Sequence, residues 1–296
     1  MKSSVRQTIC PLLAAFFWGT AIAAQKICTA YLAPFALNCI RSALAFVILL
    51  VICLCRRKKK YGTARDITLG SLCCGTALFL ASNLQYIGLS GTSSGKVGFI
   101  TALYIILVPL IGRFFGKKTS PQIWAAVALA VVGMYFLCVK EDFSLSISDL
   151  QVLIGAFLFA AQILLVDHFV QSVDSIALSC GQFLVVTVLS ALCMGITAEK
   201  FSAVMLAKWI WPLLYVAIFS NVVAYTLQIV AQKGANPTIV SLLLSMESVF
   251  SALSGALLLH ERLGRREAAG CGLMMAAVIL AQLPGLLDRK RRKAKA

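Results

Sequence analysis

Long apolar runs separated by short polar connections fill this chain from end to end. Each run has about 20 residues, the length of helix that crosses a hydrocarbon layer of roughly 30 Å. Pro34, Pro121 and Pro237 stand near the beginnings of three runs, and proline is tolerated at the start of a helix because its missing N–H would have no partner there. The pattern predicts an all-α integral membrane protein with ten transmembrane helices, near residues 8–26, 34–55, 67–87, 94–114, 121–139, 150–168, 176–197, 208–230, 237–259 and 266–286.

The chain also repeats itself once. Residues 84–120 correspond to residues 227–263 with an offset of 143, and nearer the amino terminus an offset of 141 pairs Arg41 with Gln182. An internal repeat indicates that each half is a structural unit of its own. Because five helices per half is an odd number, the second unit must enter the membrane upside down. We therefore expect an inverted five-plus-five repeat.

This repeat divides the chain into four parts. Residues 1–140 form the first repeat, and residues 141–149 form a linker that follows the polar end of the first half. Residues 150–287 form the second repeat, and residues 288–296 form a basic tail. The connections between the predicted helices are all short, so the chain has no room for a soluble catalytic domain.

Composition supports a membrane protein and excludes nucleic acid as a partner. Hydrophobic residues make up 60% of the chain and charged residues 13%, whereas soluble domains have about 45–50% and about 25%. The net charge of +16 arises from short basic bursts between apolar runs, and no folded soluble domain remains to present a basic patch to DNA or RNA. The 11 cysteines are scattered through apolar segments, where a free thiol behaves as a small hydrophobic group.

The basic residues also predict the orientation in the membrane. With the amino terminus inside, the cytoplasmic segments hold 18 Lys and Arg residues and the outer segments hold 8. Cytoplasmic loops carry the excess of positive charge in membrane proteins. We therefore expect a multi-pass protein of the cytoplasmic membrane with both termini in the cytoplasm.

Two charged side chains lie well inside apolar runs, Arg41 in the second predicted helix and Glu247 in the ninth. A charge at membrane depth is costly and usually faces the interior of the bundle. Glu247 is a candidate for proton coupling or for pairing with a cation, and a buried neutral acid beside Ser245 and Ser248 is the structural alternative. Arg41 is a candidate charge site, with a tether between the halves as its alternative. The repeat places Tyr104 at the position of Glu247, and we expect the two to lie opposite each other.

Amide and phenol side chains form a polar stripe in each half. The third predicted helix carries Asn83, Gln85 and Tyr86, and the eighth carries Asn221, Tyr225 and Gln228. Residues three or four apart share a helical face, so the two stripes are able to meet across a central cavity. Hydrogen bonds between helices would use the same side chains, and both interpretations stay open. Trp18, Gln25 and Gln162 complete the cavity candidates.

Motifs of enzymatic or ATP-driven chemistry are absent. The sequence contains no Walker A, H-E-x-x-H or haem motif, which argues against ATP-driven transport by this chain alone. Residues 91–95 spell the G-x-S-x-G motif of hydrolases, but that motif needs a strand-to-helix turn and a histidine partner, and here it lies between two predicted membrane helices. We expect neither an enzyme nor a bound metal or cofactor.

Three segments carry a family resemblance. They are Trp18-Gly19 through Lys26, Pro34 followed by Arg41, and residues 246–250 leading to residues 257–263. These segments resemble the EamA-like family of the drug/metabolite transporter superfamily, and the resemblance covers essentially the whole chain. The sequence departs from the usual family pattern at Ser248, where proline is usual, and at His260, where glycine is usual. The resemblance implies ten helices, an inverted repeat, a central cavity, and transport, often export, of small metabolites such as amino acids.

These observations predict a secondary active or facilitative transporter that moves small, amino-acid-like metabolites outward by alternating access between inverted halves. An exporter of lipophilic cations is the alternative, ranked second because Arg41 accompanies the single acid Glu247 at membrane depth. A non-transporting scaffold or sensor is a remote alternative, which predicts a cavity filled with apolar side chains. The expected partners are a small-molecule substrate and the lipid bilayer, and a monomer is the simplest expected state.

Overall fold

The computed structural model describes residues 2–56, 61–91, 94–117, 119–138, 146–199, 209–258 and 264–294. Every regular element in these ranges is a helix, so the all-α class expected from the sequence is confirmed for this part of the chain. The helices are α1 (Lys2–Thr29), α2 (Pro34–Arg56), α3 (Ala64–Gly91), α4 (Ser94–Ala102), α5 (Tyr104–Phe114), α6 (Pro121–Cys138), α7 (Ile147–Phe169), α8 (Ser175–Ile196), α10 (Ile210–Tyr215), the π-helix η1 (Val216–Tyr225), α11 (Thr226–Gln232), α12 (Pro237–Leu244), α13 (Glu247–Leu258) and α14 (Arg265–Ala294).

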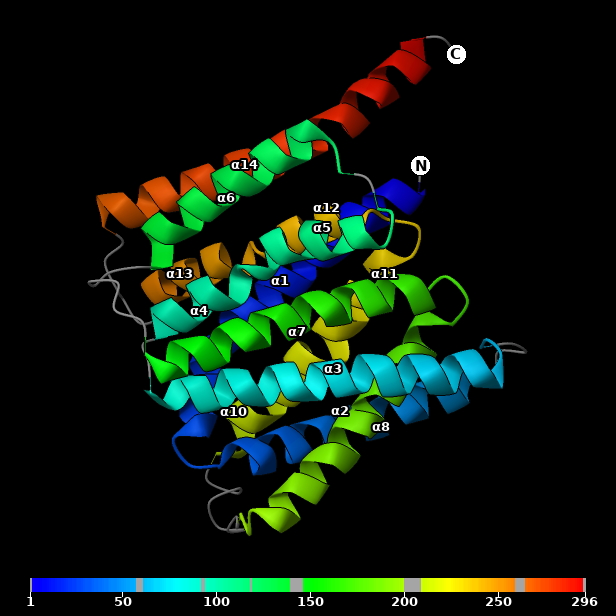
Figure 1. Ribbon diagram of the computed structural model, residues 1–296, viewed down its shortest axis with the longest axis vertical. Coiled ribbons are helices and arrows are strands. Elements are labelled where there is room, and N and C mark those ends of the chain that lie inside the picture. Colours follow the sequence, from blue (N-terminus) through cyan, green and yellow to red (C-terminus); the bar gives the residue numbers. More distant parts are fainter. Residues whose placement is uncertain are drawn as a thin grey trace.

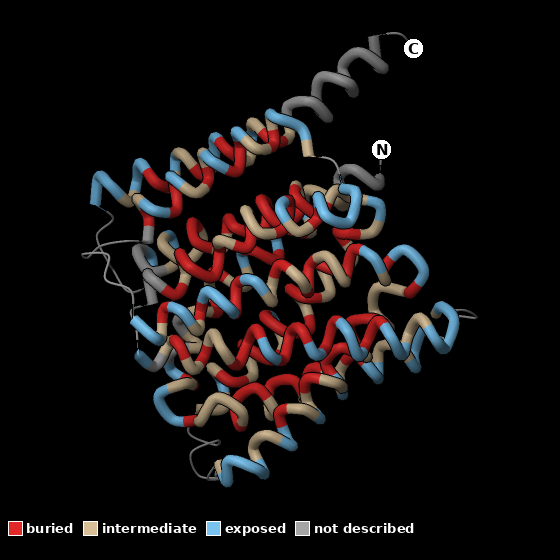
Figure 2. Tube along the Cα trace, in the orientation of Figure 1, coloured by how far each residue is buried: buried red, intermediate tan, exposed pale blue. Residues whose placement is uncertain are grey.

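Within the described ranges, seven helical stretches are long and apolar enough to cross a membrane. They are Pro34–Arg56, Ala64–Leu89, Val97–Phe114, Ile147–Phe169, Ser175–Ile196, Ile210–Gln232 and Pro237–Ser254, and Pro121–Leu137 is a shorter apolar helix. Apolar side chains such as Val47, Val51 and Leu54 of α2 are exposed, while the buried positions are concentrated in the interior of the bundle (Figure 2). An apolar exterior suits lipid rather than water. The protein is a multi-pass membrane protein.

The three prolines mark helix starts as the sequence predicts. α2, α6 and α12 begin at Pro34, Pro121 and Pro237. The side chain of Asn236 caps α12 by accepting from the Thr238 N–H at 2.9 Å, which satisfies one of the donors left free at a helix start. Local sequence therefore decides where these helices begin.

Two stretches that were expected to be continuous helices, near 94–114 and 237–259, are interrupted. The first divides into α4 and α5 at Leu103, and the second divides into α12 and α13 at Ser245 and Met246. With the repeat offset of 143, Leu103 corresponds to Met246, so the two interruptions occupy equivalent positions in the two halves.

Tight turns replace the regular helical hydrogen bonds at both interruptions. The N–H of Leu103 donates to the carbonyl of Ile100, three residues back, at 3.2 Å. In the second half, the N–H of Ser248 donates to the Ser245 carbonyl, and the Ser245 hydroxyl donates back to the Leu242 carbonyl. Serine side chains that bond to the preceding turn compete with the helix and bend it. The interruption forms here although Ser248 stands where proline is usual in the family that the sequence resembles.

Most of the helices pack side by side, and α8 runs at a steep slant to α3 (Figure 1). α3 lies against α7 and α8, α2 lies along α8, and α1 contacts α13, η1 and α11. α6 and α14 form a pair at the edge of the bundle (Figure 1), with Gly133 and Gly270 allowing their backbones to touch. The amino-terminal end of α1 and the carboxy-terminal end of α14 lie at the same end of the bundle (Figure 1). We call this the terminal end.

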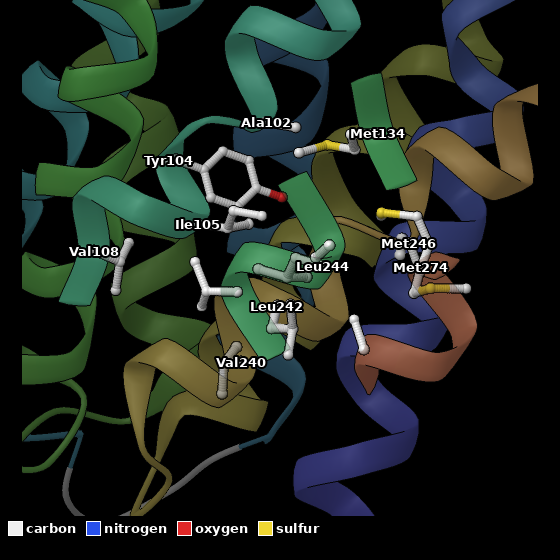
Figure 3. Close-up of a cluster of buried hydrophobic side chains, with 14 of the residues drawn as sticks. Ala102, Tyr104, Ile105, Val108, Met134, Val240, Leu242, Leu244, Met246 and Met274 are labelled. Atoms are coloured by element: carbon white, nitrogen blue, oxygen red, sulfur yellow. The ribbon is translucent and has the colours of Figure 1, made fainter. Parts of the chain in front are cut away.

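A buried apolar cluster fixes the interrupted helices in place. Ile105 and Val108 of α5 pack in one cluster with Leu242 and Leu244 of α12, and Met274 of α14 belongs to the same cluster (Figure 3). Inside a membrane, such side chains stabilise the bundle through van der Waals packing rather than through removal from water. The interruptions therefore lie in a packed part of the molecule, where the ends of the short helices have defined positions.

Candidate functional site

A cavity of about 110 Å³ lies between the helices near the two interruptions. Its wall is formed by α1, α2, α3, α4, α5, α7, η1, α11, α12 and α13. At about 10–15 Å³ per water molecule, this space takes roughly seven to eleven waters or a small organic molecule. Of the twelve residues that the sequence singles out, ten line the cavity: Trp18, Gln25, Arg41, Gln85, Tyr86, Tyr104, Gln162, Tyr225, Gln228 and Glu247.

The cation of the cavity is Arg41, which is buried with 3% of its surface exposed. Its Nε donates to Oδ1 of Asn38 at 3.1 Å, and Nδ2 of Asn38 donates to the Ser82 hydroxyl at 3.0 Å. The guanidinium lies over the Tyr86 ring, 5.0 Å from the ring centroid. Such contacts offset part of the cost of burying a cation. All of them belong to α2 and α3 of the first half, so these contacts do not form the tether between halves that was the alternative for Arg41.

The acidic side chain of the cavity belongs to Glu247, the first residue of α13. Aligned backbone dipoles stabilise a negative charge in the first turn of a helix. In the described part of the chain its carboxylate makes no hydrogen bond or salt bridge, and it does not pair with Arg41. Ser245 donates to a backbone carbonyl instead, and the Ser248 hydroxyl has no partner in this part of the chain. The cavity therefore holds a carboxylate and a guanidinium that do not neutralise each other by direct contact.

An aromatic wall joins α1 to η1. The Trp18 indole N–H donates to the Ser220 carbonyl at 3.1 Å, and its ring lies edge-to-face with Tyr225 at a centroid distance of 4.8 Å. Tyr225 in turn contacts Phe183 of α8. Ser220 and Tyr225 both belong to η1, and π-helical turns frequently occur at functional sites. These contacts hold the two rings in fixed orientations on the cavity wall.

Three glutamines from three helices form a hydrogen-bonded chain. Nε2 of Gln228 donates to Oε1 of Gln162 at 3.1 Å, and Nε2 of Gln162 donates to Oε1 of Gln182 at 3.3 Å. All three side chains are essentially buried. Oε1 of Gln228 has no protein partner among the described residues, and a buried carbonyl oxygen without a partner costs about 1–3 kcal/mol. The chain therefore presents a hydrogen-bond acceptor on the cavity wall.

Tyr104 occupies the start of α5, as Glu247 occupies the start of α13. Both line the cavity, in keeping with their equivalent places in the repeat. The Tyr104 hydroxyl is buried and has no partner in the described ranges. Nε2 of Gln85 donates to the Thr101 hydroxyl at 3.0 Å, which joins α3 to α4. The first half thus presents a neutral phenol where the second presents an acid.

Asn83 does not line the cavity, although the sequence suggests it. Its Nδ2 donates to the Phe79 carbonyl of its own helix at 2.8 Å. Successive residues of a helix are rotated by about 100°, so Asn83 points away from the helical face on which Ser82 lies. The face of α3 that reaches the cavity carries Ser82, Gln85, Tyr86 and Leu89.

Asn221 also lies away from the cavity, fully buried and with neither amide atom partnered in the described ranges. Asn221 lies in the π-helix η1, whose hydrogen bonds join residues five apart, so the regular α-helical period does not apply there. Ser220 and Tyr225 are the η1 residues that line the cavity.

Several wall residues were not singled out from the sequence. Helical phase would have found Ile22, which lies between Trp18 and Gln25 on the same face of α1. No pattern distinguishes the apolar wall residues from other membrane-buried side chains. The complete set that sequence analysis missed is Ile22, Ser82, Leu89, Val97, Gly98, Thr101, Phe159, Ile163, Ser220 and Leu244.

No metal centre is evident in the part of the chain that the structure describes. Within it, no three His, Cys, Asp or Glu side chains converge in a way that would hold a metal ion. The cysteines of this part are free thiols. The chemistry of the cavity is therefore that of one acid, one guanidinium, amides and aromatic rings.

Comparison with known proteins agrees with this architecture. The model of the EamA-like transporter family matches residues 8–139 and again residues 146–283. A protein of Archaeoglobus fulgidus, described as an uncharacterized transporter, is 30% identical over 272 residues, which cover 92% of this chain and 84% of that protein.

A protein of known crystal structure is similar in fold, with a TM-score of 0.80 and 18% sequence identity, over 94% of this chain and 96% of that one. At this identity the likeness concerns the fold alone. The family match, in contrast, covers nearly the whole chain and points to membrane transport rather than to an enzyme. The protein is therefore a membrane transporter that belongs to the EamA-like family of the drug/metabolite transporter superfamily.

Proposed function

We propose that the protein moves small, amino-acid-like metabolites across the cytoplasmic membrane, outward, as a secondary active or facilitative carrier that works by alternating access. The substrate binds in the cavity between the halves. Transport is driven either by the gradient of the substrate itself or by exchange of the substrate with protons at Glu247.

The observation that carries this proposal is the unpaired charge couple of the cavity. Arg41 and Glu247 line the same space, and no salt bridge joins them. Two opposite charges in a poorly solvated site attract ligand groups of the complementary sign. An α-amino acid carries a carboxylate for Arg41 and an ammonium group for Glu247. A small zwitterion therefore satisfies both groups together, whereas an uncharged solute satisfies neither.

Alternating access is supported by the equivalence of the halves. The family model matches twice, over residues 8–139 and 146–283, which supports a division into two repeats such as the proposed 1–140 and 150–287. Interrupted helices occur at equivalent places, α4–α5 and α12–α13, and such pairs of interrupted helices mark the binding sites of carriers with inverted repeats. α1 and α7, the first helices of the two halves, run in opposite directions (Figure 1), as inverted halves require.

Ten spans follow if α1, α6 and α14 cross the membrane along with the seven stretches described above. An even number of spans places both termini on one face, in agreement with the terminal end of the bundle. The excess of Lys and Arg in the segments assigned to that face makes it the cytoplasmic face.

The test is transport by the purified protein in proteoliposomes, with a mixture of the proteinogenic amino acids as the probe. We expect counterflow of a subset of them. Glu247→Gln and Arg41→Gln should each lower it by at least about tenfold, because each leaves one substrate charge buried without its partner. Glu247→Gln should also remove any dependence on a proton gradient. Gly272→Ala serves as the control, since an added Cβ there meets nothing within 4 Å. Absence of amino acid counterflow by the folded wild type would refute the proposed substrate class.

Export of a lipophilic cation is the second candidate, because the acid Glu247 shares its cavity with the rings of Trp18, Tyr86 and Tyr225. Aromatic rings stabilise cations. Arg41→Gln separates the two candidates, since it removes the partner of a substrate carboxylate but also removes a charge that repels a cation. Tetraphenylphosphonium transport that rises in Arg41→Gln, without amino acid transport by the wild type, would favour the cation exporter.

A further inference from the structure

Ion pairs join the two halves at the terminal end of the bundle. Lys117, which follows α5, donates from Nζ to Oδ2 of Asp167 in α7 at 2.7 Å. Arg56, the last residue of α2, pairs with Asp174, the N-cap of α8, at 2.9 Å. The ends of α5, α2 and α7 that carry these residues lie on the same side as the two chain termini (Figure 1). Each pair takes one partner from the first half and one from the second.

These two ion pairs differ in burial. The Asp167 side chain is 3% exposed, and that of Lys117 is 52% exposed. The corresponding values for Arg56 and Asp174 are 31% and 13%. A carboxylate as buried as Asp167 is strongly disfavoured once its partner is removed. The Asp174 carboxylate is more exposed and also accepts from the Ile176 N–H, so it keeps a donor when Arg56 is removed. The Lys117–Asp167 contact is therefore the stronger of these two ion pairs.

The Lys117–Asp167 pair lies directly beyond the cavity. Ile163 lines the cavity and precedes Asp167 by four residues in α7, which is about one helical turn. The Ile163 carbonyl accepts from Nε2 of Gln232 at 2.7 Å, so α11 is tied to α7 at the same depth. Towards the other end, the cavity wall includes Gln25 and Leu89, near the last residues of α1 and α3. The pair thus stands between the cavity and the terminal end.

We propose that the Lys117–Asp167 ion pair is a gate. It closes the cavity towards the membrane face at the terminal end, which we call the terminal face, and it separates whenever the cavity opens to that face. This proposal rests on the alternating-access part of the proposed function and not on the substrate class. Opening towards the terminal face parts the two halves there, and the partners of the pair belong to different halves. An interaction present in one conformation and lost in the other shifts the population towards the first. Breaking the pair therefore increases the time that the cavity is open to the terminal face.

The gate is tested by the accessibility, from each face of the membrane, of residue 163, which lies on the cavity wall one helical turn from Asp167. Ile163→Cys, in a background without other cysteines, is labelled with a membrane-impermeant maleimide in vesicles of each orientation, with a carboxy-terminal tag reporting which face is outside. Lys117→Gln and Asp167→Asn should each raise labelling from the terminal face by at least about fivefold. Labelling of the double variant should be only slightly higher than that of either single variant, because both substitutions remove the same contact.

Two control variants sharpen this test. Lys117→Arg keeps the charge and should label like the parent, and Arg56→Gln removes the other ion pair and should change labelling by less than about twofold. Size-exclusion chromatography in detergent identifies any variant that fails to fold.

Unchanged labelling in both folded gate variants, or an equal rise in Arg56→Gln, would overturn the gate. If the wild type transports amino acids but labelling is unchanged in the gate variants, the gate is refuted and the proposed substrate class is not. If labelling rises in the gate variants but the wild type does not transport amino acids, the proposed substrate class is refuted and the gate is not.

Discussion

The backbone of α1 comes very close to that of α13 at Gly19. A Cβ added at this position would lie 2.6 Å from the Glu247 carbonyl oxygen, and 2.8 Å from both the Phe250 Cβ and the Ser251 nitrogen. Two of these three atoms belong to the backbone and cannot rotate away. Gly19→Ala should therefore push α13 away from α1 and move the Glu247 carboxylate with it.

The contact distances give the size of this effect. Ordinary contacts of a Cβ begin near 3.4 Å, so the 2.6 Å approach requires a separation of about 0.8 Å at the Glu247 carbonyl. Overpacking of this kind costs about 1–3 kcal/mol, while replacing glycine by alanine within a helix returns about 1 kcal/mol. The net loss of stability is then roughly 0–2 kcal/mol. Displacement of a binding group by about 1 Å lowers function by up to about 100-fold, so transport should fall far more than stability.

Thermal unfolding in detergent and initial transport rates in proteoliposomes measure the two effects. Gly272→Ala in α14 is the matched control, because no atom lies within 4 Å of the added Cβ. We expect this control to transport like the wild type and to be equally or more stable. The reasoning is wrong if Gly19→Ala behaves like Gly272→Ala in both assays.

Two further predictions concern the aromatic wall and the topology. Trp18→Phe keeps a ring against Tyr225 but removes the hydrogen bond to the Ser220 carbonyl. It should lower the free energy of unfolding by about 1 kcal/mol, and the unfolding temperature with it. An unchanged unfolding temperature would show that this hydrogen bond contributes nothing to stability. Single cysteines at positions 117 and 260, the second of which lies outside the described residues, should react with an impermeant reagent from opposite faces; labelling from one face would contradict the inverted repeat and alternating access with it.

The general outline of the protein could be predicted because membrane helices are marked locally. Length and hydropathy define an apolar run, and the prolines at 34, 121 and 237 fix three helix starts. The cavity charges were also recognisable, since a charge at membrane depth is rare enough to indicate an interior site. The sequence alone therefore identifies Arg41 and Glu247 as candidates for the cavity.

The interruptions and the exact cavity wall could not be predicted, because hydropathy alone does not show where a helix divides or which residues line a cavity. The division at Ser245 depends on where its hydroxyl donates, and the division at Leu103 occurs in an uninterrupted apolar run. The π-helix departs from the regular helical period, and the structure places Ser220, not Asn221, on the cavity wall with Tyr225. Hydrogen bonds and packing between segments distant in the sequence determine which residues line the cavity.

A symmetric scaffold carries an asymmetric site in this protein. Arg41 and its repeat counterpart Gln182 occupy equivalent places on α2 and α8, the pair of helices that pack against each other. Arg41 is held by Asn38 and by the Tyr86 ring. The repeat offers Gln182 a different environment, because Ser179 stands for Asn38 and bonds to Thr226 instead, while the aliphatic Ile229 stands for Tyr86.

This difference makes the location of the cation, and not only its presence, essential. The double variant Arg41→Gln with Gln182→Arg conserves the net charge and exchanges the two halves at this position. An arginine at 182 would be fully buried, would lack an aromatic ring, and would replace the acceptor of the Gln162 amide. We expect the double variant to transport no better than Arg41→Gln, and to be less stable by about 3–5 kcal/mol because the new charge is buried without a partner. Recovery of transport would mean that the halves are interchangeable at this position, in which case support by Asn38 and Tyr86 does not define the site.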